Sequence, residues 1–168
     1  MFPKLVIMMA CALSASVFAA DTVTINVTGN VVASPCTVNG GSSTLDVKLG
    51  DIQAATLSAA GAVSTAVPFS LKFTDCPAGT KSVSAAFSGT PDPDAGGYYK
   101  NNGTAKNVAI GIYQTSTGFG KGNGTNIVQD VQADHTVTMD MQAKAYSSAG
   151  GATPGTITGA IVVTMSYN

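Results

Sequence analysis

The feature that most constrains this chain is a strict two-residue alternation over residues 22–31, within the segment 21–32. Every second position is apolar or glycine, and the positions between are Thr or Asn. The first set comprises Val23, Ile25, Val27, Gly29 and Val31. Successive side chains of a β-strand point to opposite faces, so the pattern predicts a strand with one face suited to burial. The pattern alone does not say whether that face is buried in this chain or in another molecule.

The first 19 residues have the layout of a secretory signal peptide. Lys4 supplies a positive charge, residues 5–13 form an apolar run, and small residues lead to Ala19. An uncleaved membrane anchor is the alternative, but the run is shorter than the roughly 20 residues that span a bilayer. A lipoprotein signal at Cys11 is a fainter alternative, because this cysteine follows too soon after a single lysine. We expect a signal peptide over 1–19, an arm over 20–32 and one domain over 33–168.

Composition indicates an all-β fold and argues against a nucleic-acid partner. The 17 charged residues are 8 Lys and 9 Asp, with no Arg and no Glu. Phosphate binding requires clustered Lys and Arg, so this mildly acidic chain is poorly suited to it. Two good helix formers are missing, while Thr, Val, Ser and Gly are abundant.

Cys36 and Cys76 are the cysteines that remain after the predicted signal peptide. An exported chain with one such pair most simply carries one disulfide. Closing this loop would stabilise the fold by about 4 kcal/mol on a chain-entropy argument. A metal site or redox pair would need close C-x-x-C spacing or histidine partners, and the sequence offers neither.

Alternating segments continue along the rest of the chain. They predict strands over residues 45–49, 67–73, 83–87, 107–113, 127–131, 136–146 and 156–167. Residues 54–66 are rich in small residues and predict a loop, with a helical turn at 54–60 left open. Short strands separated by turn signals favour a β-sandwich.

The sequence shows little that could carry chemistry. His135, the only histidine, lies in a polar turn beside Asp134, and no G-x-S-x-G nucleophile motif is present. Asp92 and Asp94 lie in a Pro- and Gly-rich loop with too few ligands for calcium. The glycine-rich run at 117–124 lacks a phosphate-binding pattern. We therefore expect no enzyme, no metal and no cofactor.

Several short motifs occur together along the chain after the arm. They are Ser34-Pro-Cys36-Thr-Val38, Leu49-Gly-Asp51, Phe73-Thr-Asp-Cys76-Pro, Ala86-Phe-Ser-Gly89, Tyr98-Tyr99, and Gly155 with the penultimate Tyr167. With the arm, they cover essentially the whole chain after residue 19. This combination resembles the type 1 fimbrial pilins that are assembled by the chaperone–usher route.

The resemblance implies an incomplete immunoglobulin-like β-sandwich that lacks one strand. A donor strand from another subunit would complete it, filling a groove beside the C-terminal strand. The implied donor residues are Val23, Ile25, Val27, Gly29 and Val31. The implied groove and chaperone contacts are Gly155, Ile161, Val163, Met165 and Tyr167. Gly29 would either permit close approach to the acceptor or mark a simple bulge.

The resemblance also implies partners and a location. The partners would be other pilin subunits, a periplasmic chaperone and an outer-membrane usher, without nucleic acid and without membrane insertion. The chain would pass through the periplasm to a surface fimbria of a Gram-negative bacterium. The predicted function is a structural subunit of an adhesive fimbria that polymerises by donor-strand exchange.

Three alternatives stay open beside this function. A carbohydrate-binding fimbrial adhesin is one, although tip adhesins of this family carry a separate lectin domain for which we expect no room here. A secreted β-sandwich enzyme or inhibitor is another. Within the family, the chain is either the repeated rod subunit or a minor tip adaptor. The segment 98–105 and the arm are somewhat closer to an adaptor.

Overall fold

A computed structural model describes residues 23–32 and 34–168 of the chain. The predicted signal peptide at 1–19 lies outside the described residues. The chain divides into a short N-terminal unit that ends at Val31 and a compact unit from Val32 to Asn168. No helix in the part that the structure describes is long and apolar enough to cross a membrane.

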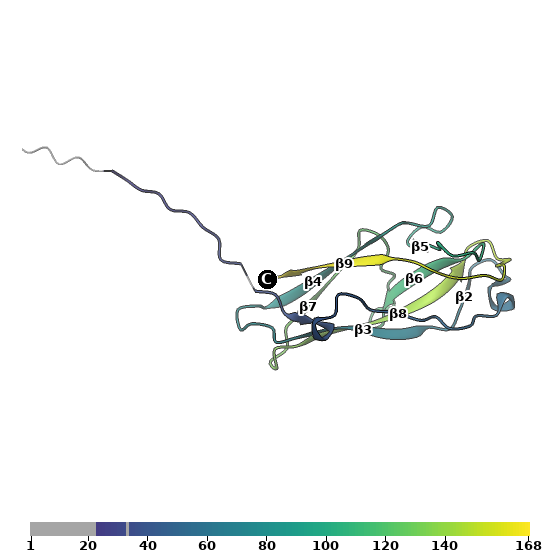
Figure 1. Cartoon of the computed structure of the whole chain (residues 1–168), viewed down its shortest axis with the longest axis horizontal. Helices are drawn as coiled ribbons and strands as arrows, with labels where there is room; N and C mark the ends of the chain where they lie inside the picture. The colour runs from purple at the N-terminus through teal and green to yellow at the C-terminus, as the bar shows by residue number, and fades with distance from the viewer. Residues whose placement is uncertain (1–22, 33) are drawn as a thin grey trace, which may run out of the picture. The chain divides into compact units, whose positions relative to one another are not determined.

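The compact unit contains two β-sheets (Figure 1). The first contains β1 (Thr37–Val38), β2 (Ala62–Val63), β3 (Val67–Thr74), β5 (Tyr99–Lys100), β6 (Ala109–Gln114) and β8 (Val137–Ser147). The second contains β4 (Ser82–Gly89), β7 (Asn126–Asp130) and β9 (Ile161–Tyr167). Two short 3-10 helices, η1 (Asn39–Gly41) and η2 (Ala54–Leu57), complete the elements described. The predicted all-β class is confirmed.

The strands of both sheets pair antiparallel. The first sheet has the order β1-β3-β8-β6-β5, with β2 also paired to β8, and the second has the order β7-β4-β9. β8 lies inside its sheet, with Leu71 opposite Met139 on one edge and Ile112 opposite Ala143 on the other. β9 lies at the edge of its sheet and runs along β4, from Val83 opposite Tyr167 to Gly89 opposite Ile161.

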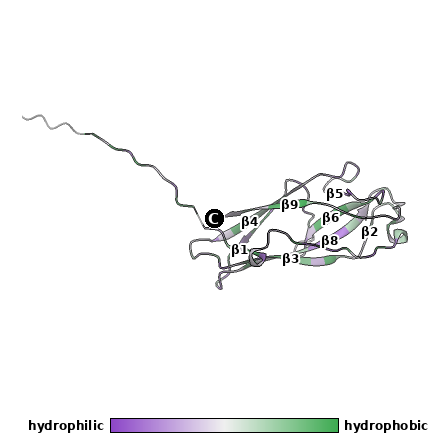
Figure 2. Cartoon of the chain, viewed as in Figure 1, coloured by the Kyte–Doolittle hydropathy of each residue, from purple (hydrophilic) through white to green (hydrophobic). Residues whose placement is uncertain are grey.

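The core is made by the inward-facing residues that the alternation supplies. Apolar residues occur in both sheets (Figure 2). The largest fully buried apolar side chains include Phe73, Val83, Phe87, Tyr99, Val137, Met139 and Met141. A smaller cluster around Leu57, Ala105, Val108 and Ala145 packs at one end. Burial of these side chains is the main favourable contribution to folding.

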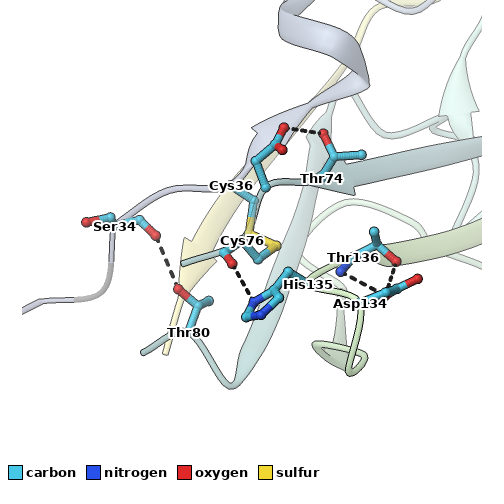
Figure 3. Close-up of a disulfide and its surroundings, with 9 residues drawn as sticks. Ser34, Cys36, Thr74, Cys76, Thr80, Asp134, His135 and Thr136 are labelled. Atoms are coloured by element: carbon cyan, nitrogen blue, oxygen red, sulfur yellow. Dashed lines mark hydrogen bonds between the residues drawn. A yellow bond between two sulfur atoms is a disulfide. The ribbon is translucent and has the colours of Figure 1, made fainter. Parts of the chain in front are cut away.

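The predicted disulfide between Cys36 and Cys76 is confirmed. It joins the residue just before β1 to a residue shortly after β3 (Figure 3). His135 is exposed, as predicted for a loop histidine, and its Nδ1 lies 2.9 Å from the carbonyl oxygen of Cys76. The Cys76 N–H donates to the carbonyl of His135 (3.0 Å), so this turn is fixed to the disulfide segment.

Three predicted segments differ from the structure by more than two residues. The predicted strand over 45–49 is wrong, since this segment forms no strand, although its alternation does bury Val47 and Leu49 in part. The predicted loop over 54–66 contains η2 and β2. The last strand begins at Ile161 rather than at residue 156.

Candidate strand-acceptor site

The inner face of β9 is only half covered. Ile161, Val163, Met165 and Tyr167 are partly buried against the main core, and the residues between them are exposed. On the adjacent strand β4, the paired residues Val83, Ala85 and Phe87 are at most 2% exposed. Two neighbouring strands with the same alternation therefore differ in how completely their inner faces are covered.

One backbone edge of β9 has no strand partner among the described residues. Within residues 34–168 the strand pairs with β4 alone. Its C-terminal end is fixed there, because the Asn168 N–H donates to Ser82 (3.0 Å) and the Ser82 N–H donates back to Asn168 (3.1 Å). An edge strand presents a row of unpaired N–H and C=O groups, which is a template for another strand.

A second segment also packs on the core and has no strand partner in the part of the chain that the structure describes. Val47 and Leu49 are partly buried against the same core cluster as β9, while Leu45 is 44% exposed. Residues 45–49 are assigned to no strand. The alternation of residues 45–49 is visible in the sequence, but no sequence signal placed Val47 and Leu49 near an acceptor site.

The arm residues are fully open to solvent. In the described part of the arm, residues 23–32 form no strand. The side chains of Val23, Ile25, Val27 and Val31 are 81–104% exposed. A Cβ added to Gly29 would meet no atom within 4 Å. Over residues 23–32 the predicted strand is therefore not formed, and four apolar side chains there are left uncovered.

Gly155 lies outside the half-covered face of β9. It precedes the strand, and a Cβ at this position would overlap the backbone nitrogen of Ala105. The structure thus brings together Ile161, Val163, Met165 and Tyr167 on one strand and places Gly155 at a contact with residues 104–105. The resemblance grouped Gly155 with the groove residues, and that role stays a prediction; the sequence did not reveal the contact with residues 104–105.

The half-covered face is apolar, with one phenol at its end. Burial raises the pKa of Tyr167 above its ordinary value. Asp46 and Lys48 lie on the exposed positions of the 45–49 segment. No group of three or more His, Cys, Asp or Glu that could hold a metal occurs among the described residues. Such a face is suited to binding an extended apolar segment.

Comparisons with known proteins identify relatives of this chain. Residues 25–168 match the family model described as Fimbrial protein. The chain belongs to this family. It is 41% identical over 155 residues to Protein FimG of Escherichia coli K12, covering 92% of this chain and 90% of FimG.

Solved pilin structures share the fold of this fimbrial protein. The P pilus rod subunit PapA is 18% identical, with a TM-score of 0.65 over 80% of this chain and 100% of PapA. A chain from a solved chaperone–usher pilus is 19% identical, with a TM-score of 0.66 over 92% of this chain and 100% of that one. The predicted pilin fold is confirmed, and the chain is a structural fimbrial subunit of a family that consists of such subunits rather than enzymes.

Proposed function

We propose that this fimbrial subunit polymerises by donor-strand exchange, with the arm of one subunit pairing along β9 of the next. The observation that carries the proposal is a match between two unsatisfied surfaces. The arm exposes apolar side chains at every second residue, and β9 has a half-covered apolar face with the same spacing beside a free backbone edge.

The donor residues in this proposal are Val23, Ile25, Val27, Gly29 and Val31. Paired beside β9, the arm would direct them into the core next to Ile161, Val163, Met165 and Tyr167. Burying the four larger donor side chains would contribute on the order of 6–12 kcal/mol before the cost of ordering. That is comparable with the whole stability of an ordinary domain, about 5–15 kcal/mol.

Val47 and Leu49 form the opposite wall of the proposed acceptor groove. They pack on the same core cluster as β9, and their segment belongs to no strand. A donor strand between β9 and residues 45–49 would give both segments a neighbour. Backbone hydrogen bonds would then supply affinity, and the alternating side chains would supply specificity.

The same open edge explains why partners are needed before assembly. An uncovered apolar edge strand pairs readily with the wrong chain. We propose that a periplasmic chaperone covers β9 first, with contacts to Ile161, Val163 and Met165, and that an outer-membrane usher exchanges it for the arm. The subunit would then reach a surface fimbria of a Gram-negative bacterium.

The test is a charge on either face of the arm. Val27→Asp places a carboxylate on the apolar face, whereas the matched control Thr28→Asp places it on the polar face. We expect Val27→Asp to abolish fibres, because an unpaired carboxylate is costly to bury, and Thr28→Asp to preserve them. Fibres are counted by electron microscopy of cells that express the chain with its chaperone and usher. Equal fibre numbers for both variants would contradict the proposal.

A further inference from the structure

Alternation alone does not fix where β9 sits on β4. A slip of one residue would turn its apolar face outward, but a slip of two residues would keep that face inward. β9 has one strand neighbour among the described residues and an inner face that is only half covered. Its register therefore needs additional anchors, and the pair between Asn168 and Ser82 supplies one at the C-terminal end.

A polar network binds the other end. Residues 148–160 connect β8 to β9, and the loop after β5 is hydrogen-bonded to the end of this connection. The Asn101 side chain makes four hydrogen bonds. Its Nδ2 donates to the carbonyls of Ala105 (2.9 Å) and Thr156 (3.3 Å), and its Oδ1 accepts from the N–H groups of Gly103 and Thr158, each at 2.8 Å. Two of these bonds shape its own loop, and two cross to the lead of β9.

Thr104 and Thr156 add a reciprocal pair. The Thr104 N–H donates to Oγ1 of Thr156 (3.0 Å), and the Thr156 N–H donates to Oγ1 of Thr104 (2.8 Å). Backbone bonds flank them, from the Asn102 N–H to the Thr158 carbonyl (2.7 Å) and from the Ala105 N–H to the Thr156 carbonyl (3.1 Å). We call Asn101, Thr104 and Thr156, with these backbone groups, the polar clasp.

Two glycines allow the clasp to close. A Cβ at Gly103 would overlap the Thr156 carbonyl oxygen, and a Cβ at Gly155 would overlap the Ala105 nitrogen. The clasp residues Thr156 and Thr158 flank Ile157, which packs against both core clusters. The clasp therefore fixes the chain immediately before β9 to the part of the molecule around β5.

We infer that the polar clasp is a register lock for the acceptor strand, with Asn101 as its central positioning residue. It holds the N-terminal end of β9 in place before a donor strand arrives. The register lock itself follows from the contacts above, whereas its value for strand capture rests on the donor-strand proposal. Pre-organising the acceptor in this way lowers the ordering cost of binding.

The test compares two neighbouring asparagines in the monomeric full chain, isolated by size exclusion. Asn101→Ala removes all four side-chain bonds. Asn102→Ala is the matched control, because the Asn102 side chain makes no hydrogen bond among the described residues and its backbone bond to Thr158 remains. Asn101→Asp, which keeps the Oδ1 acceptor and loses the Nδ2 donor, is the milder variant if Asn101→Ala fails to fold.

Hydrogen exchange of backbone amides gives the first measurement. We expect Asn101→Ala to speed exchange at residues 156–167 on the order of tenfold, with the β3–β8 ladder unchanged and Asn102→Ala behaving as the parent chain. Equally faster exchange in both sheets would overturn the inference, since the clasp would then stabilise the whole domain rather than β9. Unchanged exchange at residues 156–167 would also overturn it.

Capture of a synthetic peptide of residues 21–32 gives the second measurement. We expect slower capture by Asn101→Ala than by Asn102→Ala at equal folded fraction. Equal capture rates for the two variants would overturn the proposed role of the polar clasp in accepting a donor strand. If the parent chain captures no peptide while the exchange contrast holds, the register lock stands and acceptance of the chain's own arm fails.

Discussion

β8 and β9 have the same alternation of apolar and polar residues, but their apolar faces are buried to different extents. On β8, Val137, Met139, Met141, Ala143 and Ala145 are at most 2% exposed. On β9, the equivalent apolar residues stay partly buried. β8 has strand neighbours on both edges, whereas β9 has one among the described residues. Alternation thus shows which face turns inward but not whether the chain itself covers that face.

The arm completes this comparison. It carries a third alternating set, and in the described residues 23–32 that set is exposed. A chain that leaves one acceptor face half covered and one apolar segment exposed is expected to satisfy both through association. The following experiments test the contrast between the closed side around β8 and the open side around β9.

The largest expected effect comes from the disulfide, which holds the segment that leads to Val47 and Leu49. Replacing both Cys36 and Cys76 by alanine should lower the free energy of unfolding by about 4 kcal/mol, because the unfolded chain gains loop entropy. Urea unfolding of the oxidised chain and the double variant measures this. An unchanged midpoint would show that the open side does not depend on the bridge.

A matched methionine pair gives the most direct contrast between the two sides. Met141→Ala on β8 should cost about 3 kcal/mol, because it leaves a cavity in the closed core. Met165→Ala on β9 should cost about 1 kcal/mol in the free chain, since its site is already partly open to water. Urea unfolding of both variants checks this, and equal losses would contradict the open state of β9.

A further effect is expected only in alkaline solution. Burial raises the pKa of Tyr99 to about 12, and its O–H donates to the carbonyl of Lys121 (2.8 Å). An unfolded tyrosine titrates near pH 10. The folded state binds this proton more tightly, so the stabilisation is full below about pH 10 and is lost as the pH rises through about 12.

Tyr167 provides the open-side counterpart to Tyr99. Burial also raises its pKa, and a bound donor strand should raise it further by excluding water, with Tyr99 unchanged. Titration of the phenolate absorbance, with Tyr→Phe variants for assignment, follows both groups. A donor peptide that leaves the Tyr167 titration unchanged would place the peptide elsewhere.

Much of the fold could be predicted from local pattern. Strands β3, β4, β6, β7 and β8 were predicted within a few residues, because period-two alternation and β-branched residues are local signals. The disulfide was predicted because two cysteines remained after the expected signal peptide. These features require no knowledge of which segments meet in space.

The errors occur where pairing decides the outcome. Residues 45–49 alternate like a strand and bury Val47 and Leu49 in part, but a strand also needs a ladder partner, and the described chain provides none there. Residues 156–160 alternate like the start of β9, yet their backbone groups at 156 and 158 bond to the loop after β5. The polar clasp was missed because its bonds join loop residues that are far apart in the sequence, and no local pattern marks such contacts.

The central claim is that the domain lacks a strand which the arm of another subunit supplies. Thermal unfolding of the chain without residues 21–32 tests it, with and without a peptide of those residues. The same peptide with Ile25→Asp is the control. We predict a marginal truncated domain whose midpoint rises on the order of 10 °C with saturating peptide, and no rise with the control. A fully stable truncated domain that responds to neither peptide would contradict the account.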